Sequence, residues 1–422
     1  MDSKRSDRRR FLKSAALAGV AAGAEQSASA QSAGTAAAAK PAGAYVHGEP
    51  SRFAPDSSPG LAVMKRIDHI TYYTPIQDSA GIITPASLHF MQTHSSEIPD
   101  LDPKQHRLTI HGMVDRPLSF SMDDLKRLPS VSRIHFLECH GNGSPMRHGD
   151  HVKKGGQPIQ YVHGMTSCSE WTGVLLSTLL KEAGVKKEAS WLVYEGGDPG
   201  KYTYTLPLAK AMDDVMVAYA QNGEPVRPEQ GHPLRMIVPG WEGPFSVKWI
   251  KHIKVVDQPY ITWNEAMNHS IPRPDLGGKS RWHHFQMAAK SVITRPSSGH
   301  KLPGPGYYEI TGLAWSGWGA VRKVEVSTNG GKTWKEAKLQ TPVLRMAHTR
   351  FNFDWNWDGE EALIQSRCTD DQGETQLSVA ELYKNWGYTD ANSQKESRAI
   401  HFNAIQPWRV AKDGSVSDAM FA

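Results

Sequence analysis

The sequence predicts an α+β domain followed by a β-sandwich, because the spacing of its strand and helix signals changes near residue 291. Before that point, short apolar strands alternate irregularly with helical segments, without the regular spacing of a doubly wound sheet. After a Pro- and Gly-rich boundary at 296–306, short strand patterns and turns continue over about 120 residues, as in immunoglobulin-like sandwiches. A chain of 422 residues has room for two or three such domains.

Local signals place the elements of the first domain. Residues 107–114 alternate like a strand, and Ser121 and Pro129 bracket a short helix with a serine cap and a proline stop. Residues 134–137 form an apolar strand, and residues 153–185 are expected to be loops followed by a helix over 175–183 that ends at Gly184. Further on we expect strands at 191–194, 202–207 and 215–219 and a helix at 208–212.

The second domain is predicted from turns and period-two patterns. Asn329-Gly330-Gly331 is a hairpin signal after a strand at 321–327. Residues 351–357 alternate aromatic and polar side chains, and further strands are expected at 308–315 and 363–367. We therefore assign 61–290 to the first domain, 291–410 to the sandwich and 411–422 to a C-terminal tail.

The N-terminus has the pattern of an export signal. Asp7-Arg8-Arg9-Arg10-Phe11 matches the twin-arginine motif, and small residues at 28–30 offer a cleavage site. Residues 1–30 are therefore expected to be a signal peptide, and the Ala-, Gly-, Pro- and Ser-rich residues 31–60 a flexible leader. The signal carries +3 of the net charge of +5, so no basic block of the nucleic-acid-binding type remains. The sequence thus predicts a periplasmic protein without a membrane span.

One stretch, residues 136–145, delivers Cys139 from an apolar strand to a loop that contains Gly141 and Gly143. Glycines let the backbone approach a ligand closely, and a thiolate is a soft metal ligand. The alternative is a small buried cysteine at a strand end. Three cysteines are too few, and odd in number, for a disulfide framework, and Cys168 and Cys368 are expected to be structural thiols.

A second stretch, residues 231–249, combines a buried strand that carries Arg235 with glycine turns that lead to Ser246 and Lys248. These side chains and backbone N–H groups suit a bound phosphate. The alternative is a solvated arginine and lysine that flank a hairpin.

The sequence lacks the motifs of several other kinds of functional site. Five histidines surround the cysteine loop, but no Cys-x-x-Cys pair or His-Glu-x-x-His helix supports a zinc or copper site. The dinucleotide fingerprint, the esterase elbow and the c-type haem motif are absent as well. The histidines, most of them expected to be polar loop residues, are His135, His140, His148, His151 and His163.

Several ordered motifs together resemble the sulfite oxidase family of molybdopterin enzymes, over nearly the whole chain after the export signal. The motifs that carry this resemblance are 138–142, 205–213, 217–224, 233–249 and 312–317. Shorter stretches resemble the branch of the family that contains the Sox sulfane dehydrogenases: 129–133, 163–165, 227–231 and 257–259.

The resemblance implies a molybdenum cofactor with one pterin, a sulfite-oxidase-type catalytic domain and a β-sandwich that dimerises. Cys139 is implied as the metal thiolate, and catalysis is assigned to Cys139, His269 and Gln92. His269 stands in for the tyrosine of the family, with Asn268 as the competing position. The residues implied to bind the pterin and its phosphate are Gln92, Thr93, His94, Asp198, Arg235, Ser246 and Lys248.

The departures from the family concern the substrate. Sulfite-oxidising members carry arginines at three positions, where this chain has Gln92, Gly143-Ser144 and Gly319-Ala320. A pocket without guanidinium groups should bind a free sulfite dianion weakly. The resemblance therefore favours oxidation of sulfane sulfur in a thiosulfate adduct on a carrier protein, with a separate cytochrome c as acceptor. Sulfite dehydrogenase is the alternative, and a sulfoxide reductase or a non-catalytic cofactor-bearing protein are lesser ones.

Overall fold

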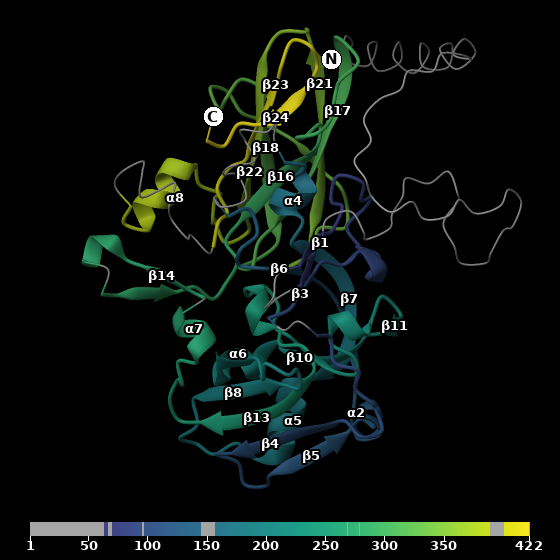
Figure 1. The fold of residues 1–422 in the computed structure, drawn as a ribbon, viewed down its shortest axis with the longest axis vertical. Helices are drawn as coiled ribbons and strands as arrows, with labels where there is room; N and C mark the ends of the chain where they lie inside the picture. The colour runs from purple at the N-terminus through teal and green to yellow at the C-terminus, as the bar shows by residue number, and fades with distance from the viewer. Residues whose placement is uncertain are drawn as a thin grey trace, which may run out of the picture.

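The computed structural model describes residues 63–65, 70–94, 97–144, 157–267, 269–277, 279–388 and 401–421. The expected signal peptide, the leader, Asn268, His148 and His151 lie outside the described residues. The fold is α+β with a C-terminal β-sandwich, as predicted. In Figure 1 the sandwich forms the upper part, the first domain the lower part, and β3, β6 and β7 lie between them.

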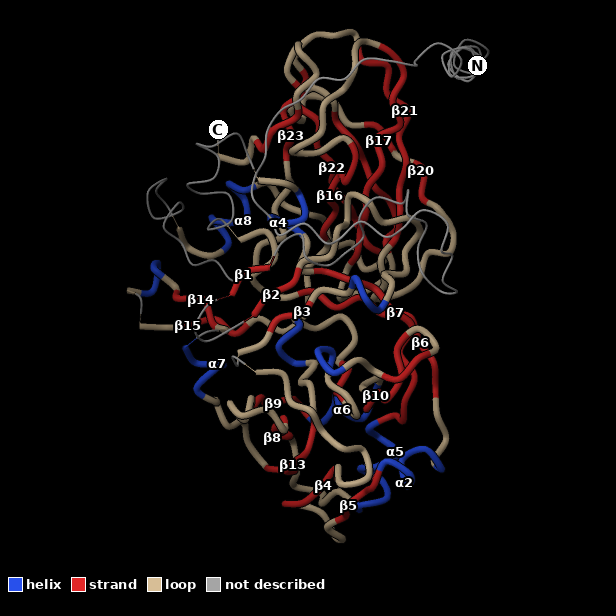
Figure 2. Tube along the Cα trace, turned by 45° about the vertical axis from the view of Figure 1, so that its right-hand side comes forward, coloured by secondary structure: helices blue, strands red, loops and turns tan. Residues whose placement is uncertain are grey.

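The first domain contains two five-stranded sheets. One has the order β5 (Leu118–Ser121), β4 (Arg107–Gly112), β13 (Ile250–Val256), β8 (Trp191–Gly196) and β9 (Thr203–Pro207), with β13 parallel to β4. The other has the order β11 (Glu224–Pro225), β10 (Met216–Gln221), β7 (Thr166–Leu175) and β6 (Val131–Glu138), and β12 (Arg235–Ile237) pairs with β10. Figure 2 shows both sheets as red strands below the sandwich.

The helices of this domain begin and end where their sequences predict. Ser121 accepts a hydrogen bond from the backbone N–H of Asp124 in a capping box at the start of α2 (Met122–Arg127). Gly184, with φ +71°, ends α5 (Leu176–Ala183) in the left-handed conformation. The buried leucines of α5 join the same core as β4 and β13. The remaining helices are α4 (Ile159–His163) and α6 (Leu208–Asp213), with 3-10 turns at Ala86–Leu88, Pro228–Gln230, Gly243–Phe245 and Pro274–Leu276.

The sandwich packs two sheets face to face. One has the order β16 (Lys290–Arg295), β17 (Gly306–Trp315), β21 (Thr349–Trp357) and β20 (Lys338–Leu339). The other has the order β19 (Lys335–Glu336), β18 (Val321–Ser327), β22 (Ala362–Asp370), β23 (Pro407–Val410) and β24 (Val416–Asp418). Its core includes Phe136, Ile159 and Cys168 of the first domain, so part of the first domain packs into the sandwich core, while the rest of that domain has cores of its own.

A small sheet, an arm and the helix α8 complete the described structure. A three-stranded sheet consists of β1 (Val63–Lys65), β2 (Ile70–Tyr72) and β3 (Met91–Gln92). An arm between the domains contains α7 (Trp263–Met267), β14 (Ser270–Pro272) and β15 (Arg281–His283), and Ile271 packs into a cluster with α8 (Val379–Asn385). Among the described residues, no helix is long and apolar enough to cross a membrane.

The structure differs from the expected elements in two places. Residues 166–175, expected to be mostly loop, form the ten-residue strand β7. Small polar side chains hide this strand in the sequence, yet they are buried and hydrogen-bonded: Ser167 to Thr74 at 2.6 Å and Ser169 to Gln221 at 2.9 Å. In the expected C-terminal tail, Val416–Asp418 forms β24 and pairs with β23, and Val416 belongs to the sandwich core.

Candidate functional site

A pocket of about 760 Å³, counted out to its open mouth, lies where β6 ends against β3 and the segment after β12. This volume is in the range of small-molecule and cofactor sites. Seven of the side chains predicted from the sequence to bind a cofactor line it, together with Cys139: Gln92, Thr93, His94, Asp198, Arg235, Ser246 and Lys248. The structure thus brings together residues that lie up to 156 positions apart in the chain.

Cys139 sits at the pocket end of β6. Its backbone N–H donates to Met165 O at 2.9 Å, and its thiol donates to Gln92 Oε1 at 3.0 Å. Burial raises the pKa of the Cys168 thiol to about 12 and that of the Cys368 thiol further still, which keeps both thiols protonated and inert. Of the three cysteines, only Cys139 lines the pocket.

A buried ion pair holds the cysteine loop to the sandwich. Lys290 Nζ lies 2.8 Å from Glu138 Oε1, and both side chains are almost completely buried. Trp315 Nε1 donates to the other carboxylate oxygen at 2.5 Å, and Asn142 Nδ2 donates to Oε1 at 2.9 Å. Because Lys290 also donates to two backbone carbonyls, every charged atom of the pair has partners. The loop next to Cys139 is therefore fixed by residues of both domains.

The pocket lining carries two cations that form no ion pair with a carboxylate of the described residues. Arg235 donates to Gln230 O at 2.9 Å and to Ser246 O at 3.1 Å, and its Nε finds no acceptor among the described residues. Within the described part of the chain, Lys248 donates to the carbonyls of Gln92 and Glu229 and to no other acceptor. Burial lowers the pKa of Arg235 to about 9, and burial and the charge of Arg235 lower the pKa of Lys248 to about 7. Such an arrangement favours a bound anion.

The other predicted pocket residues surround these cations. Ser246 Oγ accepts from Val238 N at 3.1 Å, so its own hydroxyl hydrogen remains available to a ligand. Asp198 is buried and accepts from the Tyr202 N–H at 3.1 Å. The ring of His94 stacks on the ring of Tyr202, with centroids 5.1 Å apart.

His269 lies beside the pocket lining. It follows α7, is buried, and its ring centroid is 4.2 Å from that of His140, which does line the pocket. Its Nδ1 is 3.3 Å from the Tyr202 hydroxyl, and its Nε2 has no hydrogen-bond partner among the described residues. Burial lowers the pKa of His269 well below 6.5 and raises that of Tyr202 well above 10, so this pair is neutral near pH 7.

Sequence reasoning missed several lining residues. His140 and Tyr202 line the pocket, whereas the sequence suggests His140 only as a zinc or copper ligand and Tyr202 only as part of a strand. Gln230 accepts a hydrogen bond from Arg235 through its side chain at 3.1 Å, and the sequence marks it only as part of the motif 227–231. A single sequence holds no sign that Tyr202 and His269 meet, because β9 and the arm are brought together only by the fold.

Comparison with known proteins agrees with this arrangement. Residues 95–263 match the family model of the oxidoreductase molybdopterin binding domain, and residues 281–387 match the Mo-co oxidoreductase dimerisation domain. The crystal structure of the sulfane dehydrogenase SoxCD from Paracoccus pantotrophus superposes with a TM-score of 0.78 at 37% identity, covering 93% of this chain and 96% of that one. The chain belongs to the sulfite oxidase family of molybdopterin oxidoreductases.

Curated relatives fall into two activities. The NADH nitrate reductase of Ulva prolifera is 34% identical over 66% of this chain, and human mitochondrial sulfite oxidase is 34% identical over 70%. The chain spans 34% of the nitrate reductase and 55% of the sulfite oxidase. These relatives therefore share the molybdopterin part of the fold, not a single substrate.

The pocket fits the molybdenum-molybdopterin cofactor of this family. One thiol faces it at the end of β6, as a soft protein ligand for the metal requires. The unpaired guanidinium Nε of Arg235 and the ammonium of Lys248 suit the terminal phosphate of the pterin. Gly243 packs so closely that a Cβ there would lie 2.8 Å from Glu138 O, so glycine at this position lets the 3-10 turn Gly243–Phe245 approach the cysteine loop.

Two of the three positions that the family resemblance expects to carry arginine in sulfite-oxidising members, Gly143 and Gly319, lie in tight packing. A Cβ on Gly143, whose φ is +78°, would lie 2.8 Å from the ring of His163. A Cβ on Gly319 would overlap the carboxylate of Asp371. Neither position has room for a guanidinium group without rearrangement of its neighbours.

Proposed function

We propose that this protein oxidises the sulfane sulfur of a thiosulfate adduct carried on a protein cysteine, and passes the electrons to a separate c-type cytochrome. The observation that carries the proposal is the neutral surroundings of Cys139. Gln92 Oε1 contacts its thiol, and the neighbouring side chains His269 and Tyr202 are uncharged near pH 7. Likeness to a sulfane dehydrogenase over 93% of the chain supports the same substrate class.

Among the described residues that line the pocket with Cys139, no arginine other than Arg235 is present, which argues against a small dianion as the preferred substrate. Arg235 and Lys248 are the only arginine and lysine among the residues that line the described pocket. We assign both to the pterin phosphate, so no further arginine or lysine among the described lining residues remains for sulfite. A persulfide-type group on a carrier brings its own binding energy from protein contacts and does not depend on an anion site.

The residues of the chain have separable tasks in this proposal. When bound, the molybdenum cofactor supplies oxygen-atom transfer to sulfur and accepts two electrons. Cys139 holds the metal, and Arg235, Lys248 and Ser246 hold the pterin phosphate. When the Tyr202 hydroxyl donates to His269 Nδ1, the ring hydrogen lies on Nε2, a buried donor without a partner among the described residues. His269 then offers a hydrogen bond to a developing charge without a change in its own protonation.

An exposed apolar surface on the arm suits a protein-borne substrate. Six large side chains between 260 and 282 are exposed, with Trp263 at 68% and Met267 at 59%. Trp263 and Met267 bound α7, which leads directly to His269. Aromatic residues of this kind form the centres of protein interfaces. We assign this surface to the carrier protein; its members are Tyr260, Ile261, Trp263, Met267, Leu276 and Trp282.

Location and assembly complete the proposal. The twin-arginine pattern supports export to the periplasm, where the cytochrome acceptor would also lie. The match of 281–387 to a dimerisation domain supports a homodimer. Likeness to the sulfane dehydrogenase SoxCD supports a cytochrome subunit as its partner. Light scattering on the purified protein tests the dimer, and Arg8→Lys with Arg9→Lys tests export, which should stop.

The first experiment measures molybdenum in wild-type protein and in Cys139→Ser, both exported from a host that makes the pterin. We expect about one molybdenum per chain in the wild type, and loss of the metal or of all activity in the variant. Cys168→Ser, which changes a buried thiol outside the pocket, is the matched control and should keep both. Folded wild-type protein without molybdenum would refute the cofactor assignment and the proposed activity.

Substrate choice is tested with cytochrome c as acceptor. The thiosulfate-charged carrier should be oxidised with a far higher kcat/KM than free sulfite. Trp263→Asp should lower turnover of the carrier by about tenfold or more and leave sulfite oxidation unchanged. Faster turnover of sulfite, insensitive to Trp263→Asp, would instead support a sulfite dehydrogenase, the activity of the sulfite oxidases that resemble this chain.

A further inference from the structure

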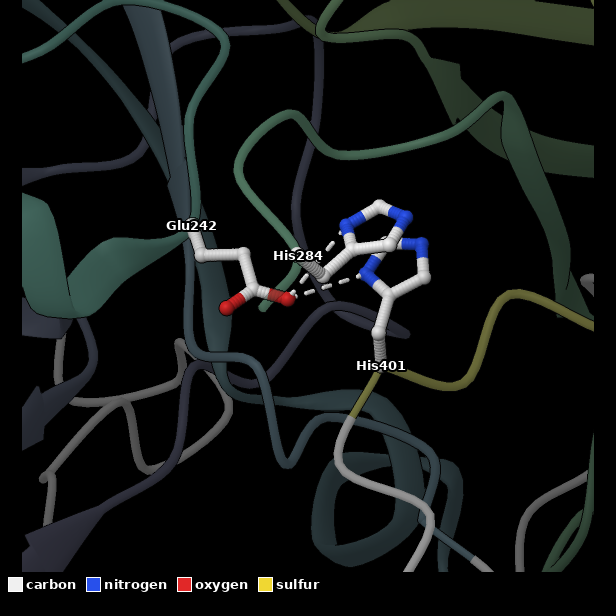
Figure 3. A group of neighbouring side chains, drawn as sticks. All are labelled: Glu242, His284 and His401. Carbon is white, nitrogen blue, oxygen red and sulfur yellow. Dashed lines mark ion pairs between the residues drawn. The ribbon is translucent and has the colours of Figure 1, made fainter. Parts of the chain in front are cut away.

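A second group of potential metal ligands lies outside the cofactor pocket. Glu242, His284 and His401 each offer one ligand atom, and the three atoms lie within 4.8 Å of one another. Figure 3 shows the carboxylate of Glu242 facing the two imidazole rings. None of these residues lines the pocket, although Glu242 precedes Gly243, which does.

The three ligand atoms are buried and lack hydrogen bonds. Glu242 Oε1, His284 Nδ1 and His401 Nδ1 have no hydrogen-bond partner among the described residues. Glu242 and His401 are 1% and 2% exposed. A buried polar atom without a partner is costly, and here three converge on one point. Such convergence calls for an atom between them.

The distances suit a metal ion. Glu242 Oε1 lies 3.3 Å from His401 Nδ1 and 3.7 Å from His284 Nδ1. Zinc bonds of about 2.0–2.1 Å in a tetrahedral site place neighbouring ligand atoms roughly 3.3–3.4 Å apart. The two imidazole rings are stacked, with centroids 3.9 Å apart, so binding of one ion requires the rings to tilt until their in-plane lone pairs meet at one point.

The charges around the group also call for a cation. The nearby carboxylate of Glu138 is neutralised by Lys290, whereas no lysine or arginine among the described residues pairs with Glu242. Burial and the charge of Glu138 raise the pKa of Glu242 well above 4.5, and burial lowers the pKa of His401 well below 6.5. A neutral histidine binds metal through the ring nitrogen that carries no hydrogen, so binding through His401 Nδ1 requires its hydrogen on Nε2 and replaces the 3.4 Å hydrogen bond that Nε2 accepts from Ala288 N. A divalent ion reverses the penalty on the carboxylate.

We propose that Glu242, His284 and His401 bind a divalent transition-metal ion of the zinc class, with water at the fourth position. The ligands come from three separate segments: the turn after β12, the connection between β15 and β16, and the segment before β23. The ion fastens the molybdopterin domain to the sandwich directly beside the cysteine loop. Two histidines and one carboxylate with an open position form a ligand set that such ions accept.

The test uses the full-length protein, freed of loosely held metal by a chelator and then titrated with Zn²⁺ or Co²⁺. We expect about one Zn²⁺ per chain, and the intense visible absorption of four-coordinate Co²⁺ in the substituted protein. Glu242→Gln, which keeps the size of the side chain, and His284→Ala should each bind the ion at least about 100-fold more weakly. His283→Ala, which removes the neighbouring histidine on β15, should bind it as the wild type does.

Stability supplies a second readout. A strong chelator should lower the Tm of the wild type and of His283→Ala, and leave that of Glu242→Gln unchanged. Wild-type protein that takes up no Zn²⁺ or Co²⁺ would overturn the proposal, and so would equal uptake by Glu242→Gln and His284→Ala. If His284→Ala does not fold, the Co²⁺ spectra of the wild type and Glu242→Gln decide the question.

The inference does not depend on the proposed function, and the same samples separate the two. Molybdenum and zinc are counted together by elemental analysis. Zinc bound to wild-type protein that lacks molybdenum would support the metal site and refute the cofactor assignment. Molybdenum without zinc, under saturating Zn²⁺, would do the reverse.

Discussion

Two clusters of buried charge, one behind the cysteine loop and one in the lining of the pocket, differ in whether their charges are balanced. The pair formed by Glu138 and Lys290 is complete, because each charged group has a counter-charge and further hydrogen bonds. Arg235 and Lys248 have only carbonyl and amide acceptors, and one guanidinium nitrogen has none among the described residues. A balanced cluster can stay buried without a ligand, whereas an unbalanced cluster of cations favours the binding of an anion.

The largest effect should follow from removal of one partner of the balanced pair. Glu138→Gln leaves the Lys290 ammonium buried without a counter-charge, and we expect the free energy of unfolding to fall by about 3–5 kcal/mol. Chemical denaturation measures this change. Replacement of both residues, Glu138→Gln with Lys290→Met, should recover much of the loss, because no unpaired charge remains. A loss below about 1 kcal/mol in the single variant would contradict the structural role of the pair.

Removal of one cation from the unbalanced cluster should weaken cofactor binding without a loss of stability. Arg235→Met removes an unpaired buried cation, so the stability of the cofactor-free protein should be unchanged or higher. Cofactor retention should fall by about 10–100-fold, the effect of one charge-assisted hydrogen bond to phosphate. Pterin and molybdenum per chain measure retention, and thermal unfolding measures stability.

Arg227→Met is the matched control for this prediction. Arg227 lies on the neighbouring segment but pairs with Glu224 at the surface, with Nε 2.8 Å from Oε1. Its loss should leave cofactor retention unchanged. Equal retention in Arg235→Met and Arg227→Met would remove Arg235 from the phosphate site.

How well the sequence predicts a feature depends on how far apart the interacting residues lie along the chain. The capping box at Ser121, the left-handed Gly184 and the turn at Asn329 are set by neighbours within a few residues, and the structure confirms all three. Strand β7 was missed because its buried face carries serine and threonine, whose partners lie on other strands. Local pattern does not reveal a polar residue that the fold satisfies from elsewhere.

The candidate site shows the same division. Motif resemblance led to Cys139, Arg235 and Lys248, which do line one pocket. The anchor from Lys290, 152 positions from Glu138, has no sequence signal. The group of Glu242, His284 and His401 has no regular spacing that a metal motif would detect. Such contacts arise only when the two domains pack together.

An added cation beside Cys139 tests whether the lack of charge there sets the substrate preference. Gln92→Arg places a guanidinium where the neutral amide now contacts the thiol, and it should lower the KM for free sulfite by about 10–100-fold. Turnover of the carrier-bound substrate should not improve. Steady-state kinetics with both substrates tests this, and Gln92→Met, which adds no charge, is the control. An unchanged KM for sulfite would show that the missing charge does not set substrate preference.

The smallest expected effect is a pH dependence that is due mainly to Lys248, since Arg235 titrates only at about pH 9. Because its pKa is lowered to about 7 from the usual 10.5, the folded cofactor-free protein binds fewer protons than the unfolded chain between these values. The contribution of Lys248 to stability should therefore be least favourable below about pH 7 and should improve as the pH rises towards 10.5. Cofactor binding requires the protonated form, so it should weaken as the pH rises above about 7, by at most about tenfold per pH unit. Cofactor retention measured from pH 6 to 9 tests this. Lys248→Arg, whose guanidinium has a higher intrinsic pKa, should flatten the profile, and a wild-type profile that is equally flat would contradict the proposed role of Lys248 in binding the phosphate.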